Sequence, residues 1–296
     1  MAFDLLAACR RRVVLGDGGM GTELQRAGLG LGESGERWNL DHPDRVEAIQ
    51  RAYVEAGSEF IITNSFGANR WVLGRYGLAD RVAEVNRAAV TIARRAAGDG
   101  GVLGDIGPFG GLLKPLGEVS LDEVRQAFLD QARALLAGGA DGIIVETMSA
   151  VEEAEAAVSA AREAGAPLVV ASMAFDRTRK GGIRTMMGVG PADAARALVA
   201  AGAVIVGANC GTRMTAPDFV EVVQAMSAAV PAPIIIQSNA GQPDLVEGRA
   251  AYRLSPEDFA SGMRDVVAAG AAIVGGCCGT TPAHVASLRA MMGARR

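Results

Sequence analysis

Histidine and lysine are almost missing from this sequence. Its 296 residues include two histidines, His42 and His284, and two lysines, Lys114 and Lys180. So few histidines limit any mechanism that depends on imidazole as a base, nucleophile or metal ligand. Neither lysine stands at the end of a predicted strand, which argues against an enzyme that forms a Schiff base. The chemistry of the chain therefore has to come from other side chains.

Long apolar runs and an excess of basic charge are also absent. No run approaches the roughly 20 apolar residues of a membrane-spanning helix. The formal net charge is −4, with both signs spread along the chain, so no basic face predicts nucleic-acid binding. The first residues, MAFDLLAACRRR, place their arginines after the apolar stretch, the reverse of a secretory signal. We therefore expect a cytoplasmic protein that binds neither membranes nor nucleic acids.

Cysteine is scarce, yet two of the four cysteines, Cys277 and Cys278, are adjacent in the segment GGCCGTTP. A disulfide between neighbours would be strained, because their Cα atoms lie about 3.8 Å apart and relaxed disulfides need roughly 4.4–6.8 Å. Inert burial and a glycine-rich phosphate loop are two further interpretations. Metal binding is the fourth, because two Zn–S bonds of about 2.3 Å place the sulfurs roughly 3.8 Å apart. Two thiolates do not complete a zinc site, so this hypothesis requires another ligand.

One structural unit repeats along the chain. Eight short apolar runs alternate with alanine-rich stretches that are typical of helices. This alternation indicates a parallel sheet covered on both faces, and eight units favour a closed (β/α)₈ TIM barrel over an open doubly wound sheet. We predict an α/β protein with a single domain over residues 1–296. The predicted strands are 12–16, 59–63, 101–105, 141–146, 167–173, 203–208, 233–238 and 271–276, and the predicted helices are near 43–56 and at 80–97, 121–138, 151–164, 191–201, 217–229, 256–269 and 282–292.

The barrel hypothesis gives each cysteine a position. Active sites of this fold lie at the carboxyl ends of the strands. Cys210 ends the sixth predicted strand, and Cys277 and Cys278 end the eighth, so the three thiols can converge on one rim. Cys9 precedes the first strand and is expected at the opposite end. Three soft thiolates with one open position describe a catalytic zinc site rather than a closed structural one.

The predicted ligand set also selects a class of reaction. A zinc ion surrounded by three thiolates is a poor Lewis acid for making hydroxide, but it can bind a fourth sulfur. A free thiol has a pKa near 8.5, so only a few per cent is thiolate at neutral pH. Zinc binding deprotonates such a thiol and leaves its sulfur nucleophilic. Thiol alkylation is therefore the predicted chemistry.

In these motifs and in others along the chain, the sequence resembles the homocysteine S-methyltransferase family over nearly its whole length. The resemblance implies that Cys210, Cys277 and Cys278 bind Zn²⁺ and that the thiolate of homocysteine takes the fourth position. The matching segments are DGGMGT (17–22), TNSFGAN (63–69), GDIGP (104–108), VET (145–147), GANCG (207–211), NAGQP (239–243) and GGCCGTTPAHV (275–285).

The same resemblance assigns two carboxylates, Asp17 and Glu146, to the ammonium group of homocysteine. The plainer alternatives are a turn-capping aspartate and a salt bridge at the barrel rim. The substrate carboxylate is expected near the backbone N–H groups of Gly18 and Gly19. Further rim candidates, each of which could instead hold a loop in shape, are Asn64, Thr147, Asn209 and Asn239.

The methyl donor is where the family divides. Members that use betaine enclose its quaternary ammonium with aromatic side chains, whereas this chain has Gly67 and Thr147 at two of those positions. These smaller residues are expected to leave space there. Trp38 matches a third aromatic or is simply packing. The motifs TNSFGAN, GDIGP and AYRLSPEDFA look like the cobalamin-dependent members, but the chain stops after one barrel. We therefore expect methylcobalamin on a separate corrinoid protein as the donor. Direct transfer from S-methylmethionine, S-adenosylmethionine or betaine is the alternative.

Two hypotheses from other classes remain compatible with the barrel. Phosphate-binding isomerases and aldolases often hold phosphate at the loops after strands 7 and 8, which are NAG and GGCCGTT here. A purely structural zinc site is the second hypothesis, although structure alone does not require an open coordination position.

Overall fold

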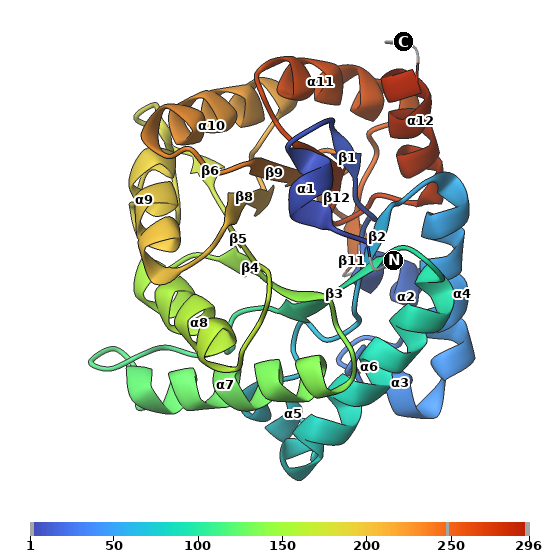
Figure 1. Ribbon diagram of the computed structural model, residues 1–296, viewed down its shortest axis with the longest axis vertical. Coiled ribbons are helices and arrows are strands. Elements are labelled where there is room, and N and C mark those ends of the chain that lie inside the picture. Colours follow the sequence, from blue (N-terminus) through green and yellow to red (C-terminus); the bar gives the residue numbers. More distant parts are fainter. Residues whose placement is uncertain (1–2, 247–248, 294–296) are drawn as a thin grey trace.

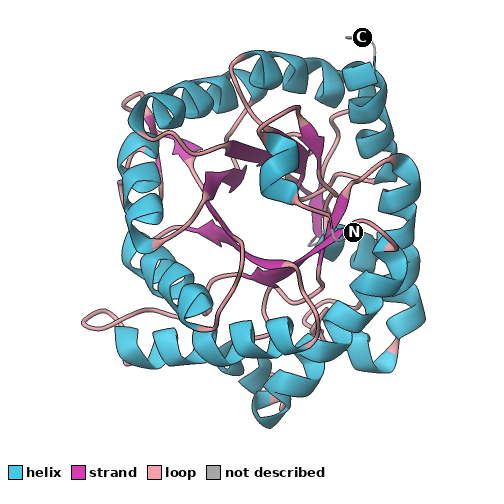
Figure 2. Ribbon diagram, viewed as in Figure 1, coloured by secondary structure: helices cyan, strands magenta, loops and turns pink. Residues whose placement is uncertain are grey.

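A computed structural model describes residues 3–246 and 249–293 of the chain and shows eight parallel strands inside a ring of helices (Figures 1 and 2). The strands are β1 (Val14–Leu15), β2 (Phe60–Ile62), β3 (Gly101–Ile106), β4 (Gly142–Met148), β5 (Val169–Met173), β8 (Ile205–Cys210), β9 (Ile234–Ser238) and β12 (Ile273–Gly276). The surrounding helices are α4 (Pro43–Ala56), α6 (Val82–Ala97), α7 (Leu121–Ala137), α8 (Val151–Glu163), α9 (Pro191–Ala201), α10 (Ala216–Ala229), α11 (Pro256–Ala268) and α12 (Pro282–Gly293). The predicted (β/α)₈ fold is confirmed, with each predicted strand and helix within a few residues of its place.

Single hydrogen bonds from the backbone and from side chains, rather than a ladder, complete the ring between β1 and β2. The ladder runs in the order β1-β12-β9-β8-β5-β4-β3-β2. At the remaining seam, the backbone N–H of Glu59 donates to the Leu15 carbonyl at 2.8 Å, and the Glu59 carboxylate accepts from the Leu15 N–H at 3.0 Å. The Asp17 carboxylate accepts from the Ile62 N–H at 2.8 Å. Asp17 therefore stabilises the barrel closure as well as facing the site.

The barrel interior changes from apolar to polar along the strands. Strand side chains alternate between the interior and the helix layer. Asp105, Glu146 and Gln237 lie two positions after the inward-facing apolar residues of β3, β4 and β9. They occupy the next inward layer and line a cavity. The apolar inward layer consists of Val14, Phe60, Ile62, Leu103, Ile144, Val170, Ile205, Ile235 and Ile273. The polar layer thus faces the carboxyl ends of the strands, where barrels of this kind carry their sites.

A short helix, α1 (Leu5–Cys9), lies across the amino end of the barrel (Figure 1). Its buried residues Leu5 and Cys9 join the apolar layer of the barrel interior. Cys9 therefore lies at the end opposite the other cysteines, as the strand order predicted.

Helix boundaries follow local signals in the sequence. The side chain of Ser120 accepts from the Glu123 N–H at the start of α7, and the Glu123 carboxylate accepts from the Ser120 N–H at 2.9 Å, a capping box. Proline occupies the first turn of α4, α9, α10 and α11, where its missing N–H leaves no helical bond unmade. No helix in the described ranges is long and apolar enough to span a bilayer.

Several short elements in the connections were not predicted. Each spans about two turns of helix or a few strand residues, which is too short for a periodic pattern to be recognised in the sequence. Besides α1 they are α2 (Met20–Arg26), α3 (Trp38–Asp41), α5 (Arg70–Gly74), the 3₁₀ turn η1 (Ala79–Arg81), and the hairpins β6–β7 (Asp176–Arg177, Ile183–Arg184) and β10–β11 (Asp244–Val246, Arg249–Ala251).

Candidate active site and metal centre

Three cysteine sulfurs meet at the carboxyl rim of the barrel. The Sγ atoms of Cys210, Cys277 and Cys278 all lie within 4.8 Å of one another, and those of Cys277 and Cys278 are 4.0 Å apart. All three are free thiols. Within residues 3–246 and 249–293, this triad is the one group of three His, Cys, Asp or Glu side chains that is so closely spaced. The strand ends therefore bring together the ligand set that the sequence proposed.

A tight turn after β12 explains how neighbouring cysteines can face one target. The Cys277 N–H still donates to the Ser238 carbonyl at 2.8 Å, as in the sheet, but the chain then turns so that the Thr280 N–H and Oγ1 donate back to the Cys277 carbonyl. Gly279 has φ of +80°, which favours glycine. A Cβ on Gly276 would lie 2.2 Å from Thr280 Oγ1. The glycines around the pair are thus required by the turn.

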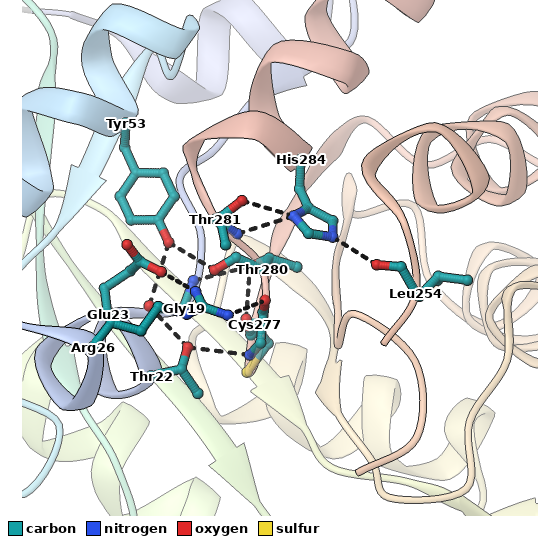
Figure 3. Close-up of polar contacts among 11 residues, drawn as sticks. Gly19, Thr22, Glu23, Arg26, Tyr53, Leu254, Cys277, Thr280, Thr281 and His284 are labelled. Carbon is teal, nitrogen blue, oxygen red and sulfur yellow. Dashed lines mark hydrogen bonds and ion pairs between the residues drawn. The ribbon is translucent and has the colours of Figure 1, made fainter. Parts of the chain in front are cut away.

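This turn is fastened to the loop after β1 by the contacts in Figure 3. The Gly19 N–H donates to Thr280 Oγ1 at 3.0 Å, and the Tyr53 hydroxyl donates to the Thr280 carbonyl at 3.0 Å. The Gly279 N–H donates to Thr22 Oγ1 at 3.2 Å. The N–H groups of Cys277, Gly279 and Thr280 therefore already have acceptors, which argues against the phosphate-loop interpretation of GGCCGTT.

His284 extends the same network and has a structural part in it. Its ring lies between Thr281 and the carbonyl of Leu254, with Nε2 3.0 Å from that oxygen (Figure 3). Burial lowers the pKa of His284, which favours the neutral ring. The other histidine, His42, packs edge-on against Trp38 with ring centroids 4.9 Å apart. Trp38 is itself buried in the hydrophobic core, so packing is the interpretation that holds for it.

Cys210 and Thr147 share an unusual backbone conformation. Both have φ of 59°, a left-handed value that side chains with a Cβ rarely adopt. Asn209, near the end of β8, hydrogen-bonds to Thr147 near the end of β4. Its Oδ1 accepts from the Thr147 N–H at 2.8 Å and from Ser172 Oγ at 2.7 Å, and its Nδ2 donates to Thr147 Oγ1 at 2.7 Å. Strain of this kind is typical of functional sites, where the surrounding structure maintains it.

The three sulfurs are electrostatically coupled. Hydrogen bonds from the Cys277 and Cys278 thiols lower the pKa of Cys210 to about 3. The same pairing with Cys210 raises the pKa of Cys277 well above its usual value and that of Cys278 to about 11. Sulfurs this close cannot all ionise without a cation between them, and a soft divalent metal would displace the remaining protons. The donor set therefore fits Zn²⁺.

Beside the sulfurs lies a cavity of about 300 Å³ with an acidic floor. Burial raises the pKa of Asp17 to about 7. Burial, and then the charges of Asp17 and Cys210, raise the pKa of Glu146 to about 8. Burial and the charge of Glu146 also raise the pKa of Asp105. Neither Lys nor Arg is among the lining residues, so the cavity suits a cationic group and not a phosphate.

Six of the eight predicted non-cysteine site residues line this cavity, namely Asp17, Gly18, Gly19, Asn64, Glu146 and Thr147. Glu146 does not form the rim salt bridge considered as its alternative, because no basic side chain lines the cavity or contributes to its pKa shift. Gly19 has a packing reason to be glycine: a Cβ there would lie 2.5 Å from the Cys277 carbonyl oxygen. Its N–H donates to Thr280, so of the two glycine amides Gly18 is the one left for a substrate carboxylate.

The predicted asparagines act mainly on other protein groups. Asn64 Nδ2 donates to the Gly35 carbonyl at 2.8 Å and to Asn39 Oδ1 at 3.0 Å, which fixes the loop before α3. Asn209 and Asn239 are not among the lining residues; their amide nitrogens lie 3.9 Å from Cys277 Sγ and 3.7 Å from Cys210 Sγ, respectively. Both asparagines therefore help to position the sulfurs without lining the cavity.

The surroundings of Gly67 contradict the expectation that this glycine leaves open space. The sequence suggested that glycine here leaves room where other members carry an aromatic wall. Instead, a Cβ on Gly67 would lie 2.8 Å from Glu36 Oε1 and 2.9 Å from Val72, because Glu36 fills this corner and accepts from the Gly67 N–H at 2.7 Å. Phe66 is the aromatic residue that lines the cavity.

Asp105 and Gln237 line the cavity but were missed in the sequence. Each stands two positions after an inward-facing apolar residue, Leu103 in β3 and Ile235 in β9. The period of two along a strand could have placed both on the inner face. The site hypothesis relied on residues at the strand ends, and it assigned no role to Asp105, within the motif GDIGP, or to Gln237.

Comparisons with known proteins agree with this geometry. A family model described as homocysteine S-methyltransferase matches residues 14–292. The methionine synthases of Mycobacterium tuberculosis and Mycobacterium leprae are 36% and 35% identical over 97% of this chain, which spans about a quarter of the length of these curated relatives (25% of each). The homocysteine methyltransferase MmuM of Escherichia coli, in its metallated form, superposes with a TM-score of 0.79 at 24% identity, covering 97% of this chain and 99% of MmuM. The carboxyl transferase domain of Rhizobium etli pyruvate carboxylase shares the fold at a TM-score of 0.53 and 17% identity, covering 95% and 46% of the two chains.

Proposed function

Because the chain belongs to the homocysteine S-methyltransferase family, we propose that it methylates the sulfur of homocysteine to give methionine, with Cys210, Cys277 and Cys278 as ligands of a Zn²⁺ ion. The observation that carries the proposal is the convergence of three sulfurs, from two strand ends, on one side of an acidic cavity. When bound, such an ion would supply a fourth position at which a thiol loses its proton and stays nucleophilic.

The protein's own residues would bind and orient the acceptor. Asp17 and Glu146 would attract the substrate ammonium, since both are carboxylates in a cavity without basic residues. The backbone N–H of Gly18 is the candidate hydrogen-bond donor to the substrate carboxylate. Asn209 and Asn239 would hold the sulfurs in place through their contacts with Cys277 and Cys210. Because hydrogen bonds fix Asp17, Asn209 and Asn239 before substrate arrives, little reorganisation of these residues would be needed on binding.

The donor that we propose is the methyl group of a corrinoid on a separate protein. The support is the 36% and 35% identity to the methionine synthases of two mycobacteria. Thr147 at the cavity edge, in place of an aromatic residue, is also compatible with a large donor. A partner of this kind would approach the carboxyl rim, where the sulfurs lie.

A small cationic donor is the second candidate, and the acidic lining favours it. Glu36 and Phe66 line both the main cavity and a neighbouring cavity of about 380 Å³. A carboxylate beside an aromatic face is a suitable environment for a sulfonium group, as in S-methylmethionine or S-adenosylmethionine.

One experiment separates these candidates. Purified protein is supplied with zinc and homocysteine and, in separate reactions, with methylcobalamin, a methyl-corrinoid protein, S-methylmethionine, S-adenosylmethionine or betaine, and methionine is quantified. Methionine formation with any donor supports the acceptor half of the proposal, and the donor identifies the other half. No methionine with any donor, from protein that contains zinc, would contradict the proposed function.

A further inference from the structure

Two of the three clustered sulfurs accept a hydrogen bond from an asparagine side chain. Asn209 Nδ2 lies 3.9 Å from Cys277 Sγ, and Asn239 Nδ2 lies 3.7 Å from Cys210 Sγ. An amide nitrogen donates and does not accept, so both contacts favour the charged form of the sulfur. The third sulfur, that of Cys278, has its donor on another part of the chain.

Tyr252 supplies the donor to Cys278. Its hydroxyl is hydrogen-bonded with the Cys278 sulfur, and a phenolic O–H can donate to a thiolate. Gly279 makes room for the ring, because a Cβ at this glycine would lie 2.2 Å from Tyr252 Cγ. The pattern is therefore one donor for each of the three cysteine sulfurs.

The backbone beside Cys278 holds Tyr252 in place. The Ala240 N–H donates to the Cys278 carbonyl at 3.0 Å. The N–H of Leu254, two residues after Tyr252, donates to the Ala240 carbonyl at 3.1 Å. His284 Nε2 in turn lies 3.0 Å from the Leu254 carbonyl oxygen (Figure 3). Tyr252 thus reaches Cys278 from a segment that is fastened to the turn carrying two of the sulfurs.

The three donors stand apart from the space in which a substrate would bind. The cysteines line the main cavity, whereas Asn209, Asn239 and Tyr252 are not among its lining residues. Tyr252 instead lines an adjoining cavity of about 290 Å³, which shares Thr22 with the main one. The donors therefore contact the cysteine sulfurs without lining the space for the ligand.

The proposed reaction poses a problem of selectivity, because four thiolates would share one ion and only the substrate's should be methylated. In the transfer, a lone pair of the attacking sulfur forms the S–C bond, and the leaving group departs from the methyl carbon with the electron pair of the broken bond. A hydrogen bond stabilises the charge on a thiolate, and part of that stabilisation is lost as the charge moves into the new bond. Donors on the cysteines therefore slow the alkylation of those sulfurs.

We propose that Asn209, Asn239 and Tyr252 direct methylation to the substrate's sulfur, because their hydrogen bonds lower the nucleophilicity of the three cysteine ligands. Tyr252 is then a positioning residue that acts through Cys278. Hydrogen bonds to a metal ligand tune it without contact to the metal. The presence of zinc and of a fourth, substrate sulfur rests on the proposed function, whereas the hydrogen bonds to the cysteines belong to the protein alone.

The test measures which cysteine of the zinc-containing protein reacts with iodoacetamide in the absence of homocysteine. Initial rates at Cys210, Cys277 and Cys278 are obtained by tandem mass spectrometry of the digested protein, while few chains have reacted. Tyr252→Phe keeps the ring and removes the hydroxyl, so alkylation of Cys278 should rise roughly 3- to 10-fold relative to the other two cysteines. The ratio within one molecule is used because a loss of zinc would affect all three sulfurs.

Further variants separate the hydrogen bond from a general loosening of the site. Tyr76→Phe removes the hydroxyl of the other half-buried tyrosine and should leave the ratio unchanged. Asn239→Leu has a similar shape and should raise alkylation of Cys210 relative to Cys278. In protein loaded with Co²⁺, Tyr252→Phe should shift the sulfur-to-metal charge-transfer absorption to longer wavelength, because a thiolate without the hydrogen bond gives up an electron more readily.

Two results would overturn the inference: an unchanged ratio in Tyr252→Phe, or an equal rise at all three cysteines, which would show a structural role. Failure of the proposed function looks different. Protein that retains no zinc, or that makes no methionine with any donor, contradicts that proposal. The ratio of alkylation among the cysteines needs neither homocysteine nor a methyl donor, so it is measured in either case.

Discussion

At the scale of single residues, the Asp17 side chain combines a structural contact with a place in the cavity. One oxygen accepts from the Ile62 N–H and so helps to close the barrel, while the residue also lines the cavity. Burial opposes its charge, yet an ionised carboxylate is what a substrate ammonium requires. The free protein therefore holds a carboxylate at a cost to its own stability, in favour of a cationic ligand.

This tension predicts a pH dependence of stability. The pKa of Asp17 is raised by burial to about 7, so the folded state holds more protons than the unfolded state between about pH 4 and pH 7. The contribution of Asp17 to the free energy of unfolding should therefore fall as the pH rises through that window. Asp17→Asn, which keeps an acceptor for the Ile62 N–H, should flatten this slope in urea denaturation of the metal-free protein.

Homocysteine binding, unlike the stability of the free protein, should be favoured by the negative charge of Asp17. Asp17→Asn should weaken homocysteine binding, and so should Glu146→Gln, because each removes a negative charge near the ammonium; a loss of roughly tenfold or more is expected for each. Zinc content should not change. The control is Asp99→Asn, an exposed position that should alter neither the slope nor the affinity. Unchanged affinity in both site variants would remove these carboxylates from the substrate site.

The three cysteines give a prediction about metal content. Wild-type protein should contain about one zinc per chain, and replacing Cys210, Cys277 or Cys278 with serine should abolish zinc retention or activity, as measured by metal analysis and methionine formation. Cys9→Ser should retain both, because Cys9 lies at the far end of the barrel. Full zinc occupancy in a Cys277→Ala, Cys278→Ala double variant would refute the assignment.

At the scale of elements, the turn after β12 is positioned by its neighbours. Thr280 is central, because its hydroxyl accepts from the Gly19 N–H and donates to the Cys277 carbonyl at 2.7 Å. Tyr53 of α4 donates to the Thr280 carbonyl. The loop after β1 and the helix α4 thus hold the turn that carries two of the three sulfurs.

Removing the Thr280 hydroxyl should therefore affect the metal centre. Thr280→Val has the same shape but leaves the buried Gly19 N–H without a partner, a cost of about 1–3 kcal/mol. We expect a lower melting temperature and weaker zinc retention during dialysis against a chelator. Thr280→Ser, which keeps the hydroxyl, should behave like the wild type. A valine variant with normal stability and normal zinc retention would show that the turn does not depend on this contact.

At the scale of the whole molecule, the site is reached from one rim of the barrel. The amino end is closed by α1, and the sulfurs, the acidic cavity and the connecting loops lie at the carboxyl end. A methyl donor must therefore approach from that side. Docking of a separate protein would be expected to use a modest, partly polar surface, as is usual for transient encounters.

The donor prediction follows from this geometry. Free methylcobalamin should support slow methionine formation from homocysteine, a methyl-corrinoid protein should be far faster, and betaine should support none, because Trp38 is buried and Thr147 replaces an aromatic residue at the cavity. Methionine is quantified over time for each donor. Robust turnover with S-methylmethionine and no corrinoid would instead favour the small cationic donor, and robust turnover with betaine would contradict the argument from the aromatic residues.

Local patterns in the sequence were enough to predict the features that depend on neighbouring residues or on a short motif. Alternating apolar runs and helical stretches predicted the eight strands and eight helices, because side-chain periodicity reports which face is buried. The position of Cys210, Cys277 and Cys278 at strand ends followed from the barrel alone, since parallel strands in a barrel end on one rim. The connecting elements were not predictable, because each is too short for its period to repeat often enough to be recognised.

Contacts between distant segments became known only from the packed chain. The Gly19–Thr280 bond joins residues 261 positions apart, and no local pattern encodes such a contact. Whether Gly67 leaves space depended on Glu36, 31 positions away, and the sequence-based expectation was wrong for that reason. Asp105 and Gln237 were recognised as lining residues only from the cavity that the packed strands enclose. Burial and the pairing of polar atoms are properties of the packed chain, and they decide which of several polar residues is left to bind a ligand.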